Sequence, residues 1–185
     1  LKTGKPVVVD EAYGEFSNSS VVDWVEDYEN LIVLRTFSKL FGLAGLRIGY
    51  GIGNEEIIIS FERVRPPFSV NSIAQEAAKA ALKDDKFVEK TRSSILEGRD
   101  YLTDKLKDFG FKVLPSEANF LMVSPKPIGG DAEEVCKFLL QKGIAIRNLS
   151  GFRGIENDWV RITVGKPKQN KRLIKYLEKY IEMKK

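Results

Sequence analysis

LIVLRTFSKLFGLAGLRIGYG, which spans residues 31–51, is the most informative segment of this chain. Its apolar runs at 31–35 and 47–51 both predict strands of one sheet. Lys39 lies shortly after the first run, and Arg47 begins the second. Because ligands of open α/β sheets bind beyond the carboxyl ends of the strands, Lys39 lies where chemistry is expected.

A third strand is expected before this segment. Residues 6–10 read PVVVD, and such an unbroken β-branched run suits a strand buried on both faces of a parallel sheet. A short helix over 21–28, capped by Ser20, completes the order strand, helix, strand of an α/β layer. Three strands are fewer than the ~5 to 6 of an average sheet. We therefore expect this chain to be the C-terminal piece of a longer protein.

Helices are expected downstream of the sheet. Asn54 caps the first, Asn71 or Ser72 begins the second, and a long third helix runs from Asp84 to Phe109. Since a long connecting helix is a natural domain boundary, the predicted division is 1–85 and 86–185. The second part has a different pattern, with strands at 111–114, 118–124, 144–147 and 159–164 and helices at 131–142 and 167–183. This order predicts a small α+β domain with a mostly antiparallel sheet.

Composition excludes several classes of protein. The 185 residues carry 30 Lys and Arg against 26 Asp and Glu, and a net charge of +4 is too small and too evenly spread for a nucleic-acid module. No apolar run approaches the ~18 to 20 residues of a membrane span. Without histidine and with one cysteine, Cys136, we expect no metal site, no histidine-dependent triad and no internal disulfide. A single cysteine fits a reducing, cytoplasmic location.

The residues with chemical potential lie at the predicted strand ends. Asp10 and Tyr13 follow the first strand, while Ser38 and Arg47 flank Lys39 in sequence. A turn-capping aspartate and a solvated lysine in a tight turn are the simpler interpretations. Together, however, these groups match what pyridoxal phosphate requires: a lysine amine, a carboxylate at the ring nitrogen, a donor at the phenolic oxygen and cations at the phosphate.

The motif Asp10-x-x-Tyr13, the pair Ser38-Lys39 and Arg47 resemble the cofactor motif of fold type I pyridoxal-phosphate enzymes. The resemblance is to the aminotransferase group that includes histidinol-phosphate aminotransferase. Residues 43–50, LAGLRIGY, match a run that follows the serine-lysine pair in that family. Further segments at 65–71, 117–120 and 160–165 resemble family segments in the same order, and Leu40 departs from the small residue that many relatives carry.

The resemblance implies a fold and a role for each residue near Lys39. It implies that 1–85 is the C-terminal part of the large, cofactor-binding domain, a mostly parallel sheet with flanking helices. The long helix and a small substrate domain would occupy 86–185. Lys39 would bind pyridoxal 5'-phosphate covalently and move the substrate's proton, and Asp10 would keep the ring nitrogen protonated. Tyr13 would donate to the phenolic oxygen, and Ser38 and Arg47 would hold the phosphate.

Substrate recognition is implied for the second part of the chain. Arg161 matches the family arginine that binds the substrate's anionic end, whether carboxylate or phosphate. Arg147 is a second candidate for the same anion, with a solvated strand-end arginine as its simpler interpretation. Asn119 is a third candidate, although an asparagine between strands more often bridges backbone groups.

The resemblance implies an aminotransferase of histidine biosynthesis. It would convert histidinol phosphate and 2-oxoglutarate to imidazole acetol phosphate and glutamate, as a homodimer that binds small-molecule amino donors and 2-oxo acids. Threonine-phosphate decarboxylase and aromatic or broad-specificity aminotransferases share the same motifs and stay open, as does a catalytically silent protein that binds an anion or a partner. Because relatives have a further N-terminal half that completes the pocket, we expect the isolated chain to bind the cofactor weakly and to transaminate negligibly.

Overall fold

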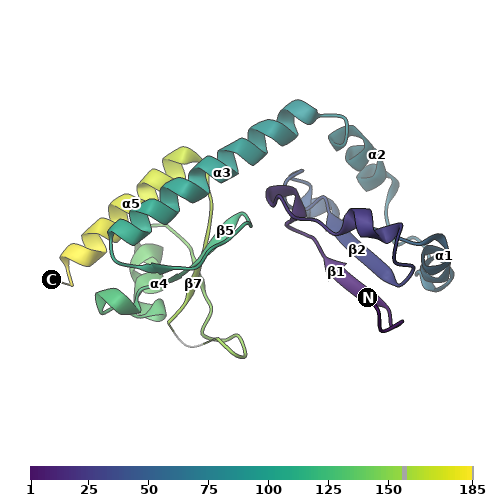
Figure 1. The fold of residues 1–185 in the computed structure, drawn as a ribbon. Coiled ribbons are helices and arrows are strands. Elements are labelled where there is room, and N and C mark those ends of the chain that lie inside the picture. The colour runs from purple at the N-terminus through teal and green to yellow at the C-terminus, as the bar shows by residue number, and fades with distance from the viewer. Residues whose placement is uncertain (156–157, 185) are drawn as a thin grey trace. The chain divides into compact units, whose positions relative to one another are not determined.

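The computed structural model describes residues 1–155 and 158–184 (Figure 1). Its contacts divide the chain into two compact units, Leu1–Arg92 and Ser93–Lys185, called unit 1 and unit 2 below. The division falls inside helix α3 (Asp85–Asp108), close to the boundary expected at 85. That unit 1 binds the cofactor and unit 2 the substrate stays a prediction.

Unit 1 contains a three-stranded sheet in the order β1-β2-β3, with β1 at Val7–Asp10, β2 at Leu31–Thr36 and β3 at Gly49–Gly53. β1 and β2 are parallel, but β3 is antiparallel to β2, so the expected mostly parallel sheet is mixed in this chain. The connection from β2 to β3 holds only a short 3-10 helix, Ala44–Leu46. A parallel neighbour would need a longer crossover, usually a helix.

The expectation that β1 is buried on both faces is wrong. Val8 is 55% exposed and Leu34, on the neighbouring strand, 40%, so the face of the strand pair that carries them is only partly covered in the described part of the chain. Only the central strand β2 is deeply buried, at Leu31, Ile32 and Val33. β1 forms an edge of this sheet, and an edge strand has a neighbour on one side only.

The helix expected over 21–28 is also much shorter. A 3-10 helix covers Val22–Val25, and a second one covers Gly14–Phe16. β-branched and aromatic residues lose side-chain freedom in a helix, which disfavours a regular α-helix here. The predicted cap, Ser20, accepts the Val22 N–H at 3.1 Å but donates its own hydroxyl hydrogen to Glu11.

The helices that follow in unit 1 agree with their predicted start signals. α1 (Glu55–Val64) is capped by Asn54, whose Oδ1 accepts the Glu56 N–H at 3.0 Å. α2 (Ser72–Ala81) is capped in the same way by Asn71, which accepts the Ala74 N–H at 2.8 Å. Each side-chain oxygen satisfies an N–H group that a helix start leaves without a partner.

Unit 2 is built on an antiparallel sheet in the order β4-β5-β7-β6, as expected. Its strands are β4 at Lys112–Val113, β5 at Phe120–Ser124, β6 at Arg147–Asn148 and β7 at Val160–Thr163. β6 is shorter and later than predicted, because residues 144–146 run outside the sheet. Helices α4 (Ala132–Gln141) and α5 (Pro167–Glu182) agree with their predicted ranges, and a 3-10 helix covers Lys126–Ile128.

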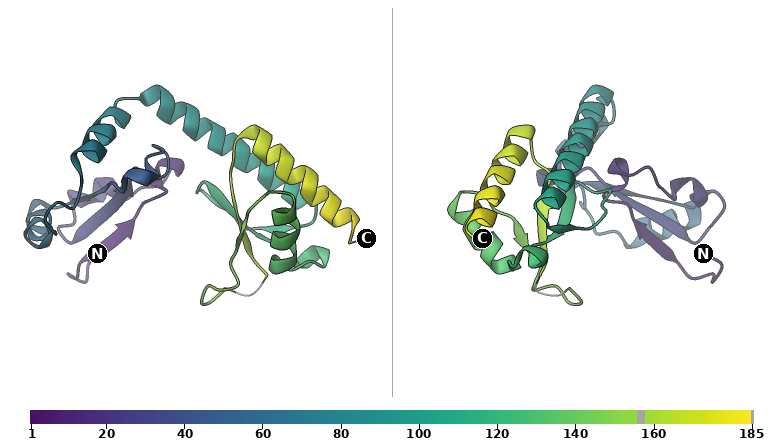
Figure 2. Two further views of the ribbon diagram at one scale, coloured as in Figure 1. Left: turned by 180° about the vertical axis from the view of Figure 1, so that it is seen from behind. Right: turned by 60° about the vertical axis from the view of Figure 1, so that its left-hand side comes forward.

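Alternation along the strands divides the sheet of unit 2 into two faces. Leu121 and Val123 of β5 and Val160 and Ile162 of β7 are at most 2% exposed. They form one core with residues of α3, α4 and α5, which gather beside this sheet (Figure 2). Successive strand residues point to opposite faces, so Arg161 belongs to the other face. Among the described helices, none combines the length and the apolar composition of a membrane span.

Candidate functional site

The end of β1 places Asp10 at the surface of unit 1. Its carboxylate is exposed, and Oδ1 accepts the N–H of Ala12 at 2.9 Å. This is the turn-capping bond that aspartate commonly makes at a strand end. An exposed carboxylate with one oxygen in the turn retains capacity to accept a further donor.

Lys39 and Tyr13 come together although they lie on different strand ends. The Nζ of Lys39 is 5.2 Å from the centroid of the Tyr13 ring, within the range of a cation–π contact. β1 and β2 are parallel neighbours, so the residues that follow them emerge at the same edge of the sheet. The structure thus brings together two of the predicted catalytic residues, Lys39 and Tyr13. The third, Asp10, is three residues before Tyr13 in the sequence.

The backbone of the loop that carries Lys39 is held by several hydrogen bonds. The Gly42 N–H donates to the Lys39 carbonyl at 3.1 Å, and the Leu43 N–H donates to Phe37 at 2.9 Å. The Ser38 N–H donates to Thr36 Oγ1 at 3.1 Å. These bonds hold the backbone from which the Lys39 side chain extends, even though the segment is not a helix.

Buried side chains on both sides of Ser38-Lys39 anchor the same loop. Phe37 is 4% exposed and Leu40 2%. The Phe37 ring packs against Phe41 and Tyr50, with centroid distances of 5.0 and 5.5 Å. The unusual residue in the motif, Leu40, is therefore part of the buried interior of unit 1.

Arg47 ends the loop in a left-handed conformation, with φ 52°. Its guanidinium is exposed and donates to the carbonyl of Ala44 at 3.0 Å. Among the described residues the structure gives no contact between Arg47 and Ser38, so it does not bring together the two groups predicted to hold a phosphate. Neither Arg47 nor Lys39 has an acidic partner among the ion pairs of the described residues.

An ion pair that the sequence analysis missed joins the ends of β1 and β2. Glu11, 8% exposed, accepts two hydrogen bonds from Arg35, at 2.9 and 3.2 Å. The Ser20 hydroxyl and the Val21 N–H donate to the same carboxylate. The parallel register sets Asp10 opposite Leu34, so the residues that follow them, Glu11 and Arg35, are neighbours. The pair could be predicted only from this register.

Two neighbouring glutamates of unit 1 have opposite electrostatic environments. Burial alone would raise the pKa of Glu11, but the hydrogen bonds from Val21, Ser20 and Arg35 outweigh it, so the pKa lies below its usual value. Burial raises the pKa of Glu15, whose two carboxylate oxygens are buried without a hydrogen-bond partner. The first carboxylate is fixed as a charged anchor, whereas the second is poorly stabilised as an anion.

The predicted substrate arginines of unit 2 are direct neighbours. Arg147 on β6 and Arg161 on β7 are Cα partners in the antiparallel register. Each guanidinium lies over an aromatic ring, Arg161 over Phe120 at 5.3 Å and Arg147 over Phe152 at 5.5 Å. The Nε of Arg161 is buried and has no hydrogen-bond partner in the part of the chain that the structure describes. The structure thus groups both arginines on one face of the sheet.

Asn119 precedes β5, and the structure shows a backbone role for it. Its carbonyl accepts the N–H of Val164 at 2.9 Å, which extends the pairing of β5 with β7. Any residue could supply this main-chain carbonyl, so the bond does not test the interpretation that the Asn119 side chain bridges backbone groups. A role in substrate binding stays a prediction.

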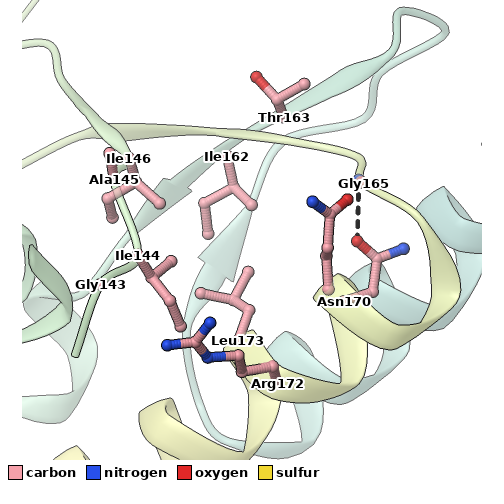
Figure 3. A pocket seen from close by; sticks show the side chains of 11 residues that line it. Gly143, Ile144, Ala145, Ile146, Ile162, Thr163, Gly165, Asn170, Arg172 and Leu173 are labelled. Atoms are coloured by element: carbon pink, nitrogen blue, oxygen red, sulfur yellow. Dashed lines mark hydrogen bonds between the residues drawn. The ribbon is translucent and has the colours of Figure 1, made fainter.

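Unit 2 also contains a cavity that none of the predicted site residues lines. It has a volume of about 350 Å³ and is lined by residues 143–146, by the end of β7 and by the start of α5 (Figure 3). Asn170, 3% exposed, lines it and accepts the Gly165 N–H at 2.8 Å, as the dashed line in Figure 3 marks. This bond ties the end of β7 to α5, so the polar group in the cavity wall has a structural role.

Comparisons with known proteins agree in the family that they indicate. The family model described as aminotransferase class I and II matches residues 2–177. A histidinol-phosphate aminotransferase of Brevibacillus brevis is 44% identical over 181 residues, which are 95% of this chain and 48% of that protein. The chain spans about half the length of the curated relatives that it matches.

Two solved structures resemble the fold over nearly the whole chain. One is the histidinol-phosphate aminotransferase of Sinorhizobium meliloti in complex with pyridoxal-5'-phosphate, with a TM-score of 0.84 and 31% identity over 96% of this chain and 49% of that one. The other is the L-threonine-O-3-phosphate decarboxylase of Porphyromonas gingivalis, with a TM-score of 0.80 and 32% identity over 95% of this chain and 55% of that one.

Proposed function

This chain belongs to the class I and II aminotransferase family, and from that premise we propose that it forms part of a pyridoxal-phosphate-dependent aminotransferase whose substrate is histidinol phosphate. The contact of Lys39 Nζ with the Tyr13 ring at 5.2 Å is the single observation that carries the proposal. It places an amine and a phenol together at one edge of the sheet, where Asp10 ends β1.

The residues of unit 1 fit pyridoxal phosphate by their chemistry. The cofactor is anionic, and the loop after β2 offers two cations, Lys39 and Arg47, that no described acid neutralises. Arg35 is different, because Glu11 already balances its charge. The Ser38 hydroxyl and the Tyr13 phenol add hydrogen-bond donors to the set.

When bound, pyridoxal phosphate withdraws electrons from the substrate's α-carbon and makes its proton acidic. In our proposal Lys39 Nζ holds the cofactor and then takes up and returns that proton. The Asp10 carboxylate keeps a proton on the ring nitrogen, and the Tyr13 hydroxyl donates to the phenolic oxygen. Ser38 and Arg47 hold the phosphate group, Arg47 with a planar fork of donors that suits it.

We assign substrate recognition to unit 2. Arg161 and Arg147 are adjacent cations on one face of its sheet, and they would bind the anionic end of the substrate. Amino donors and 2-oxo acids both carry such groups. Association into a homodimer and a cytoplasmic location are further parts of the proposal, which light scattering and cell fractionation of the intact enzyme would test.

The test uses the intact enzyme, meaning the polypeptide that contains this chain at the full length of its relatives. Borohydride reduction should leave a pyridoxyl group on the peptide that contains Lys39, as mass spectrometry of a digest would show. Lys39→Ala should abolish this adduct, whereas the matched control Lys83→Ala should retain it. An adduct on other lysines only, or none at all, would contradict the proposal.

A second candidate function is the decarboxylation of threonine phosphate. The similarity to the decarboxylase of Porphyromonas gingivalis supports it, at 32% identity. The same site residues would serve both reactions, so the substrate must decide. Glutamate formation from histidinol phosphate and 2-oxoglutarate favours the transaminase, and release of carbon dioxide from phosphothreonine favours the decarboxylase.

A further inference from the structure

Arg161 on the inner strand β7 and Arg147 on the edge strand β6 of unit 2 have an unusual electrostatic setting. Arg147 and Arg161 are Cα partners, and like charges that face each other across two strands are unfavourable. No ion pair or side-chain hydrogen bond to an acid holds either guanidinium within residues 1–155 and 158–184. The arrangement is therefore suited to an external anion.

Aromatic rings take the place that acidic partners would otherwise have. The Cζ of Arg161 is 5.3 Å from the ring centroid of Phe120, and the Cζ of Arg147 is 5.5 Å from that of Phe152. Both distances lie within the ~6 Å range of a cation–π interaction. Phe120 comes from β5, where its Cα partner is Thr163, so its ring reaches Arg161 diagonally across the strand pair.

An aromatic ring and a carboxylate differ in what they leave of a guanidinium's charge and N–H donors for binding an anion. A carboxylate would neutralise the charge and occupy the planar donors that recognise an anion. A ring attracts the cation through its face, which leaves the charge and the N–H donors available. Since the Nε of Arg161 is buried and has no hydrogen-bond partner among the described residues, the contact with the Phe120 ring is the interaction there that can fix the orientation of this side chain.

We propose that Phe120 and Phe152 are positioning residues, which hold Arg161 and Arg147 ready to bind the anionic group of the substrate. The inference rests on the proposed function, because that function makes these arginines the anion-binding groups. It adds two aromatic side chains of unit 2 to the binding apparatus, one from a strand and one from the loop after β6.

The first test measures the affinity of the intact enzyme for inorganic phosphate by calorimetry. Phe120→Leu keeps an apolar side chain but removes the ring, and it should weaken phosphate binding about 3- to 10-fold. Phe120→Tyr keeps the ring and should stay within about 2-fold of the wild type. Met122→Leu is the matched control, because Met122 is the Cα partner of Arg161 and has no ring to lose.

The second test changes Phe152, the more exposed of the two phenylalanines. Phe152 is 47% exposed, so Phe152→Leu should fold normally even if a change at Phe120 disturbs the sheet. Its effect on phosphate affinity should be smaller, about 2- to 3-fold, because solvent weakens the contact. In steady-state assays both leucine variants should raise KM for the phosphate-bearing substrate by the same factors while kcat at saturation stays unchanged.

Two results would overturn the inference. One is a Phe120→Tyr enzyme that binds phosphate as weakly as Phe120→Leu, since volume and not the ring face would then matter. The other is phosphate binding that is absent or indifferent to Arg161→Lys. The proposed function fails separately, through the absence of a pyridoxyl adduct on Lys39, and that readout does not depend on either phenylalanine.

Discussion

Unit 1 and unit 2 have about equal lengths but very different interiors. Unit 2 closes its sheet with three helices around one continuous apolar cluster. In unit 1 only short segments reach such burial, while Val64, Phe68 and Ile73 are 76%, 101% and 73% exposed. Because apolar burial is the dominant favourable term in folding, unit 2 contains its own source of stability, whereas unit 1 leaves much of its apolar surface in water.

The largest expected effect tests this difference in packing. Leu102→Ala in α3 removes a side chain that is 0% exposed, and we expect a loss of about 2 to 5 kcal/mol in the free energy of unfolding. Ile73→Ala in α2, at an exposed position of unit 1, should change it by less than about 0.5 kcal/mol. Urea denaturation of the purified chain measures both, and equal losses would remove the contrast.

The next prediction compares two arginines with different partners. Arg35 is paired with a mostly buried glutamate, and its replacement by alanine leaves that charge uncompensated. Since both side chains are partly solvated, we expect Arg35→Ala to cost about 2 to 3 kcal/mol, somewhat below the loss for a fully buried pair. Arg147→Ala removes an exposed cation that has no acidic partner within residues 1–155 and 158–184, and it should be neutral within about 0.5 kcal/mol. Chemical denaturation of the two variants decides whether the contrast holds.

The two glutamates of unit 1 predict opposite responses to pH. The pKa of Glu11 lies below its usual value, so its contribution to stability is complete above about pH 4.5 and is lost as the pH falls through the lowered pKa. The pKa of Glu15 is raised by burial, so its ionisation opposes folding as the pH rises above about 4.5.

Unfolding curves between pH 3 and 7 separate these contributions. Glu11→Gln should lower stability at pH 7 and flatten the loss on acidification. Glu15→Gln should raise stability at pH 7, and its advantage should shrink as the pH falls. If Glu15→Gln is destabilising at pH 7, the carboxylate has a partner that the raised pKa does not reflect.

The smallest expected effect concerns backbone strain, which the two units handle differently. The described left-handed residues of unit 2 are all glycines, whereas unit 1 also uses Arg47 and Phe68. Phe68 has φ 58° and is fully exposed, so its ring contributes no packing within the described chain. Phe68→Gly should therefore stabilise by about 0.5 to 1 kcal/mol, while Phe68→Ala should not. A thermal melt of the two variants measures the difference.

The sequence predicted the elements whose signals are local. The caps Asn54 and Asn71 depend on hydrogen bonds within one turn of chain. The direction of β3 was not predictable in the same way, because it follows from how the loop after Lys39 turns back. Ser20 shows the limit most clearly, since a distant carboxylate recruits its hydroxyl and the expected helix does not form.

The candidate site was predictable as chemistry but not as geometry. The sequence motif singled out Lys39, Tyr13 and Asp10. The parallel pairing of β1 with β2 then explains why Lys39 and Tyr13 lie close together. The Glu11–Arg35 pair and the adjacency of Arg147 to Arg161 depend on strand register, which no single segment of sequence encodes. The roles of these residues in binding and catalysis remain proposals for experiment.

The placement of Leu40 has one more consequence. The Leu40 side chain is 2% exposed and directly follows Lys39, so the buried interior and the proposed cofactor lysine are adjacent in the sequence. We therefore expect that warming which loosens this interior displaces the lysine before the whole chain unfolds. Inactivation by heat should then precede unfolding by several degrees, and a search for heat-tolerant variants has its first target in the packing beneath Leu40 and not at the lysine itself.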